Sequence, residues 1–138
     1  MACLQHWPYQ NCLHSWAQLL TAYDKFLHKV NHLPEAFPPP PIDGVEDEDF
    51  EIMPLKSCTA VRREAAEMSN CLESFVVKIG SLENYAYKLI RPERASVLLK
   101  CDRRQWRIEE AMIKANARAV SPETMKLLRY WIQNYCQN

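Results

Sequence analysis

The sequence lacks several features that mark whole classes of protein. Only two of its 138 residues are Gly, which argues against a loop-rich all-β design. No apolar run approaches the roughly 18 residues that a membrane-spanning helix needs, so we expect no contact with a membrane. The first residues, Met1 to Pro8, have neither the basic nor the apolar region of a secretory signal. We therefore expect a cytoplasmic protein.

An excess of charge of one sign is also missing, since 17 Lys and Arg balance 17 Asp and Glu. The balance hides a division along the chain. Residues 1–87 hold 6 Lys and Arg against 12 Asp and Glu, and residues 88–138 hold 11 against 5. Such asymmetry can mark a face that binds a partner. The simpler interpretation is that the two halves neutralise each other across one domain.

Familiar catalytic and cofactor motifs are absent as well. The sequence contains no P-loop, HExxH, GxSxG or GxGxxG pattern. We therefore expect no cofactor, and we favour binding without catalysis over an enzyme. The length suits a single domain over residues 1–138, which is long enough to bury a core without disulfide bonds.

The cysteines include no CxxC pair, although there are six of them: Cys3, Cys12, Cys58, Cys71, Cys101 and Cys136. In the absence of a secretion signal they predict reduced thiols, most of them packed as small apolar side chains. A metal site is the alternative for one cluster near the N-terminus, which consists of Cys3, His6, Cys12 and His14. Its spacing matches no standard zinc pattern, so we expect no metal.

The first 51 residues divide into a helical segment and a linker. Over residues 1–33, apolar side chains three and four apart predict an amphipathic helix that packs on the domain or docks a partner helix. The linker over residues 34–51 is rich in Pro and in acids. Pro38 to Pro41 predict a stiff extended spacer. The acid run that follows, residues 43–51, predicts a solvated and mobile loop.

The remaining residues, 52–138, predict an α+β core. Helical spacing from Ser57 to Gly80, with a polar break at Ser69-Asn70, indicates a central helix or helix pair. Alternating apolar residues then predict a three-stranded antiparallel meander over about residues 84–113. Ser121-Pro122-Glu123 predicts the start of a C-terminal helix. We expect the N-terminal, central and C-terminal helices to pack on one face of this small sheet.

Four stretches taken together resemble a known family. They are Leu33-Pro-Glu-Ala-Phe-Pro-Pro-Pro-Pro-Ile-Asp-Gly44, Met68-Ser-Asn-Cys-Leu72, Arg91-Pro-Glu-Arg-Ala-Ser-Val97 and Ala119-Val-Ser-Pro-Glu-Thr124. In their order and spacing they resemble the PcfJ-like proteins of plasmids and other mobile elements, over about residues 33–138. The resemblance implies a mobile-genetic-element context, in which the chain would be an accessory protein of conjugation.

The resemblance also assigns particular positions. The family's Cys corresponds to Cys71, but the His that usually precedes it is Asn70 here, and the Asn before the last helix corresponds to Asn116. If the family performs His–Cys chemistry, this chain has lost its His. Cys71 and Asn116 are then the catalytic candidates of a cysteine-dependent enzyme, which is the second alternative to binding. The structural alternative is that Cys71 packs on a helix and Asn116 bridges a loop.

The leading hypothesis is a non-catalytic protein that contacts the conjugation machinery or a host defence factor. Its partner-binding residues would be the acids of the loop, which could face a basic groove on the partner. These are Asp43, Glu46, Asp47, Glu48, Asp49 and Glu51.

The first alternative is a nucleic-acid-binding protein that uses the basic C-terminal half. Its phosphate-binding residues would be Arg91, Arg94, Arg103, Arg104 and Arg107. Tyr85, Tyr87 and Trp106 could stack on bases if the sheet face is open. The simpler interpretation places those aromatic side chains in the core.

Overall fold

The computed structural model describes residues 34–136, so the helix predicted within residues 1–33 lies outside the described residues. The strands are β1 (Val45–Glu46), β2 (Glu51–Pro54), β3 (Asn84–Arg91), β4 (Ala95–Asp102) and β5 (Gln105–Met112). The helices are α2 (Cys58–Met68), η3 (Leu72–Phe75), α3 (Val76–Gly80), η4 (Lys114–Asn116) and α4 (Pro122–Tyr135). The fold is α+β, and the central helix is split after Met68 as the polar break indicated.

The sheet has five strands in the order β1-β2-β3-β4-β5, and every neighbouring pair is antiparallel. The predicted meander corresponds to β3, β4 and β5, but the prediction of three strands was wrong. Residues 45–54 form a hairpin that pairs with β3, so the sheet begins inside the predicted linker. The apolar residues from Ile52 to Leu55 favour a short strand at β2, whereas the two residues of β1 are too few for an alternation that the sequence could reveal.

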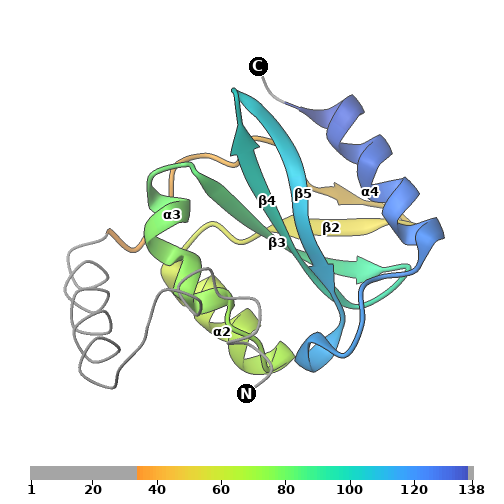
Figure 1. The fold of residues 1–138 in the computed structure, drawn as a ribbon, viewed down its shortest axis with the longest axis horizontal. Coiled ribbons are helices and arrows are strands. Elements are labelled where there is room, and N and C mark those ends of the chain that lie inside the picture. Colours follow the sequence, from red (N-terminus) through yellow and green to blue (C-terminus); the bar gives the residue numbers. More distant parts are fainter. Residues whose placement is uncertain (1–33, 137–138) are drawn as a thin grey trace, which may run out of the picture.

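Helices cover both faces of this sheet, and not one face as predicted (Figure 1). On one face, Glu64 of α2 accepts a hydrogen bond from Ser96 of β4. On the other face, Trp131 of α4 packs edge-on against the ring of Tyr87 in β3. Strands β3 and β4 are therefore buried from both sides, which explains why consecutive residues in their first halves are buried.

The helices begin where the sequence indicated. Ser57 caps α2, and its Oγ accepts a hydrogen bond from the amide of Ala60 at 3.1 Å. Ser121 caps α4 in the same way, with Pro122 in the first helical turn. The buried face of α4 consists of Thr124, Leu128 and Trp131.

A buried tyrosine hydroxyl fixes the extended segment before β1 to the sheet. The Tyr87 hydroxyl donates a hydrogen bond to the Ile42 carbonyl at 2.8 Å and accepts one from the Ile42 amide at 3.1 Å. Trp131 donates from its indole nitrogen to the Asp43 carbonyl at 2.7 Å. Burial raises the pKa of Tyr87 well above its usual value. One residue of β3 thus holds both the 34–44 segment and α4.

The outer edge of β5 is only partly covered. The Val120 amide donates to the Ala111 carbonyl, and the Ile113 amide donates to the Arg118 carbonyl, so the returning chain pairs with the end of the strand. Among residues 34–136, no strand lies beside the outer edge of residues 105–110. Glu109 is an extra residue opposite β4, which makes a bulge within this open part.

The Tyr87→Phe substitution should destabilise the fold by about 1–3 kcal/mol, because it leaves the buried amide and carbonyl of Ile42 without their partner. Urea denaturation of the full chain measures the effect. Tyr130→Phe is the matched control, since the Tyr130 side chain is 62% exposed, and it should change stability by less than about 0.5 kcal/mol. Equal stability of the two variants would contradict the role assigned to the Tyr87 hydroxyl.

Candidate functional site

The predicted partner-binding acids form an ordered turn between β1 and β2. The Asp47 carboxylate accepts hydrogen bonds from the amides of Asp49 and Phe50, both at 2.9 Å. These amides hold the pKa of Asp47 below its usual value. Arg91 donates to the Asp47 carbonyl and forms an ion pair with Glu51. The run predicted to be mobile is therefore a structured hairpin, named here the acidic hairpin (residues 45–54).

The six acids do not all face solvent in the same way. Glu51 is mostly buried beside Arg91, and Asp47 is used by the turn. The backbone of Asp43 is bonded to α4, through its carbonyl to Trp131 and through its amide to Tyr135. The remaining three carboxylates, those of Glu46, Glu48 and Asp49, lie exposed along the hairpin.

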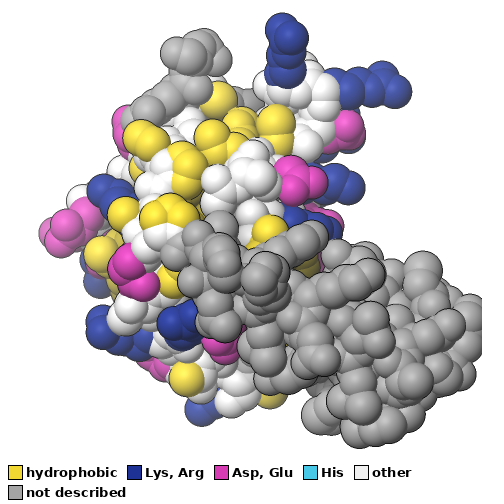
Figure 2. Space-filling model, turned by 90° about the vertical axis from the view of Figure 1, so that its left-hand side faces the viewer, with side chains coloured by type: hydrophobic (Ala, Val, Ile, Leu, Met, Phe, Trp, Pro, Cys, Tyr) yellow, Lys and Arg dark blue, Asp and Glu magenta, His cyan; other side chains and the backbone are white. Residues whose placement is uncertain are grey.

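The five predicted nucleic-acid-binding arginines are likewise divided. Arg91 is paired with Glu51, Arg94 with Glu64, and Arg107 with Asp102 at 3.7 Å. Arg103 and Arg104 alone among the five form no ion pair with a described residue, and both are exposed in the turn between β4 and β5. Figure 2 shows Lys and Arg side chains interspersed with Asp and Glu side chains on the face viewed there, without one continuous basic field.

The aromatic residues proposed to stack on bases belong to the core. Tyr85 and Tyr87 are fully buried, and the Tyr85 hydroxyl donates to the Pro38 carbonyl at 2.8 Å. Burial raises the pKa of Tyr85 to about 12. Trp106 is half-buried and packs against the same core. These side chains hold the Pro-rich segment on the sheet and present no open stacking platform.

The buried Glu64 of α2 forms an ion pair with Arg94, the residue just before β4. Glu64 is 2% exposed, and it accepts from Arg94 through both carboxylate oxygens, one of them at 2.8 Å. The Ser96 hydroxyl donates to the same carboxylate at 2.7 Å. The Glu64 carboxylate raises the pKa of Arg94 further above its usual value. Glu64 therefore holds the Arg94 guanidinium, although the Arg94 side chain is 29% exposed, and phosphate binding by Arg94 stays a prediction.

The polar network continues to the residues that the family resemblance singles out. Asn70 donates from Nδ2 to the Ser96 hydroxyl at 3.1 Å and accepts from the Leu72 amide at 3.0 Å. A cavity of about 30 Å³ beside it is also lined by Cys71 and Asn116. Asn70 and Cys71 of one stretch and Asn116 of another part of the chain thus meet around one small space, large enough for about one water molecule.

The two catalytic candidates beside this cavity are an oxidised cysteine, Cys71, and an asparagine with a left-handed backbone, Asn116. The sulfur of Cys71 is in a disulfide bond, so the prediction of a reduced thiol is wrong at this position. A nucleophilic role applies only to the reduced chain and stays a prediction. Asn116 has a left-handed backbone with φ of 53°, after Ala115 with φ of 59°. Ala115 and Asn116 are the last two residues of η4, the short helix that leads from β5 toward α4.

Glu93 in the Glu-Arg-Ala motif fastens the β3–β4 turn to α4. Its carboxylate accepts hydrogen bonds from the Ser121 amide at 2.8 Å and from the hydroxyl of Thr124. Arg118 lies 3.1 Å from the other oxygen. The Thr124 hydroxyl, the Ser121 amide and Arg118 lower the pKa of Glu93 to about 2. This part of the family-like motif therefore has a structural role.

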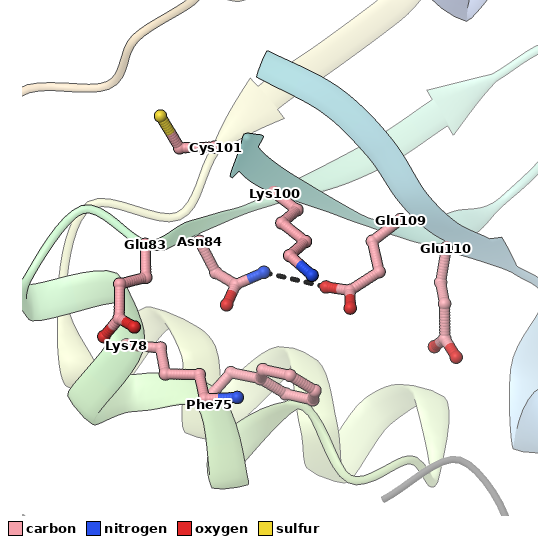
Figure 3. Close-up of a pocket in the computed structure, with 8 residues that line it drawn as sticks. All are labelled: Phe75, Lys78, Glu83, Asn84, Lys100, Cys101, Glu109 and Glu110. Atoms are coloured by element: carbon pink, nitrogen blue, oxygen red, sulfur yellow. Dashed lines mark hydrogen bonds between the residues drawn. The ribbon is translucent and has the colours of Figure 1, made fainter. Parts of the chain in front are cut away.

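A larger hollow lies between α3 and the sheet, and no motif in the sequence indicated it (Figure 3). Its volume is about 330 Å³. The lining residues come from η3, α3, β3, β4 and β5 and from the turn before β3: Phe75, Lys78, Glu83, Asn84, Lys100, Cys101, Glu109 and Glu110. One irregularity in the sequence could have indicated the bulge beside this hollow. Trp106 and Ile108 face the core two residues apart, but the next core residue is Ala111, three positions later.

The proposed metal cluster of Cys3, His6, Cys12 and His14 lies outside the described residues. Within residues 34–136, no group of three or more His, Cys, Asp or Glu side chains is placed to hold a metal ion. In the same part of the chain, no helix has the length and apolar character required to span a bilayer.

Comparisons with protein-family models, with curated proteins and with solved structures give no match to this chain. The PcfJ-like resemblance therefore rests on the sequence motifs alone and stays a prediction.

The Arg94→Met substitution should destabilise the fold by about 3–5 kcal/mol, because it strands the Glu64 carboxylate in the interior without a cation. Arg107→Met is the matched control: its ion pair with Asp102 is exposed, and its loss should cost less than about 1 kcal/mol. Urea denaturation at neutral pH measures both. A stable Arg94→Met protein would show that the Glu64–Arg94 pair does not hold α2 on the sheet.

Proposed function

We propose that the chain is a non-catalytic binding protein that contacts a basic surface of another protein through the acidic hairpin. In the mobile-element context that the motifs imply, that partner belongs to the conjugation machinery or to host defence. The observation that carries the proposal is the ordered acidic turn, in which Asp47 and Arg91 hold the backbone while Glu46, Glu48 and Asp49 remain exposed.

The order of this turn favours recognition over simple solvation. A disordered acid run would lose conformational freedom on binding, whereas a fixed hairpin presents its charges without that cost. Three exposed carboxylates on one rigid tip also attract a basic partner at long range, which mainly raises the association rate. Arg91, which contacts the hairpin, does not neutralise these three carboxylates, because its guanidinium is paired with Glu51.

The double substitution Glu48→Lys and Asp49→Lys should weaken the complex at least about tenfold, since it opposes like charges across the contact. The partner is first identified by cross-linked capture from the native host and then purified for calorimetric titration. Glu73→Lys with Glu123→Lys is the control, because it makes the same change of charge at exposed positions of η3 and α4. An equal loss of affinity in both double variants, or no loss in either, would rule out the hairpin as the contact.

Nucleic-acid binding is a second candidate, favoured by one observation. Arg103 and Arg104 form the two-residue turn between β4 and β5 with φ angles of 52° and 67°. Such turns prefer Asn-Gly, and each non-Gly residue in the left-handed region costs roughly 1–2 kcal/mol. Strained residues that persist at an exposed tip suggest a function, and two adjacent guanidinium groups suit phosphates.

Replacing Arg103-Arg104 by Asn-Gly tests this candidate, because the new residues suit the turn and remove only the charges. Stability should be kept or increased, while retention on duplex DNA falls and the slope of log affinity against log salt becomes shallower by about 0.9 per lost contact. Lys126→Gln with Arg129→Gln on α4 is the matched control. Unchanged retention of the Asn-Gly variant would exclude the turn as a nucleic-acid contact.

A further inference from the structure

The hollow of about 330 Å³ between α3 and the sheet is a second place where a ligand can be held. It lies at the Asn84 end of β3, whereas the acidic hairpin is fixed to Arg91 at the other end of that strand. The two sites are thus separated by the length of an eight-residue strand. A volume of this size is at the lower limit for small-molecule sites and suits a molecule of amino-acid dimensions.

Both positively and negatively charged side chains line the hollow. Lys78 and Lys100 face it from α3 and β4, and Glu83, Glu109 and Glu110 supply three carboxyl groups (Figure 3). Neither lysine forms an ion pair with a residue in the described part of the chain. Lys78 lies over the Phe75 ring, with its ammonium 5.7 Å from the ring centroid. Two ammonium groups therefore remain available to an anionic group.

The β-bulge determines where the carboxylates of Glu109 and Glu110 point. Because Glu109 is the extra residue opposite β4, its side chain lies on the same face as that of Glu110 instead of alternating with it (Figure 3). Asn84, which is 4% exposed, donates from Nδ2 to Glu109 at 2.8 Å and to the Leu99 carbonyl at 2.9 Å. These two bonds orient the Asn84 amide and hold the Glu109 carboxylate at the rim.

The charge pattern selects the kind of molecule that fits. A simple anion would meet three glutamates, and a simple cation would meet two lysines. A molecule with both an anionic and a cationic group can place each beside its counterpart, and its carbon chain can lie against Phe75. We infer that the hollow binds a small zwitterion in which a carboxylate and an ammonium are separated by a short carbon chain.

Titration of the full chain with three matched probes tests this inference. The probes are 4-aminobutyrate, butyrate and butylammonium, which share a four-carbon chain and differ only in their charges. Amide shifts in ¹⁵N spectra should saturate with 4-aminobutyrate at a roughly millimolar dissociation constant and report on Asn84 and Lys100. The two singly charged probes should bind at least about tenfold more weakly. β-Alanine and 6-aminohexanoate extend the test to other chain lengths.

Two variants assign the site within the chain. Lys100→Met and Glu109→Gln should each weaken binding of the zwitterion by about tenfold or more, since each removes one charged contact. Lys126→Met and Glu123→Gln on α4 are the matched controls and should leave it unchanged. Unperturbed spectra of the variants away from the hollow establish that they are folded.

Three results would overturn the inference. They are the absence of saturation by all three zwitterions up to about 10 mM, equal binding of the singly charged probes, and binding that survives both Lys100→Met and Glu109→Gln. None of these results depends on the acidic hairpin, so the failure of this site and the failure of the proposed protein contact can be distinguished.

Discussion

Burying a carboxylate is costly unless a cation and hydrogen-bond donors lie beside it, and this constraint ties α2 to the sheet. Glu64 satisfies it with Arg94 and Ser96, and the bonds join the middle of α2 to the first residues of β4. The network extends through Asn70 to the turn that carries Cys71. The geometry around the small Cys71 cavity therefore depends on an ion pair whose carboxylate is almost completely buried.

The equal numbers of acidic and basic residues acquire a structural meaning from these contacts. Part of the acidic half faces the basic half within the domain, through Arg91 with Glu51, Arg94 with Glu64 and Lys88 with Glu67. Among the charges left exposed, Glu46, Glu48 and Asp49 gather at the turn between β1 and β2, and Arg103 and Arg104 form the turn between β4 and β5. The strand register places these two turns at opposite ends of the central strands, so a small acidic group and a basic pair lie at the two ends.

Local signals in the sequence identified much of the fold. Ser57 and Ser121 begin helices because their side chains accept hydrogen bonds from amides in the first helical turn. Such caps can be predicted from neighbouring residues alone. The partners of Glu64 and Tyr87 are 30 to 45 residues away, and no local pattern could reveal them. The same holds for the hollow near Asn84, whose lining is assembled from separate elements. The acidic hairpin was missed because its apolar alternation is too short.

The open portion of β5 bears on how this sheet behaves in a concentrated solution. An exposed edge strand can recruit the edge of another copy and start aggregation. Here the strand is interrupted by the bulge at Glu109, and Arg107 is exposed just before it. A second strand laid along this edge would lose continuous backbone pairing at the bulge and meet charged side chains. The irregularity that shapes the hollow thus also protects the sheet from growing beyond its own chain.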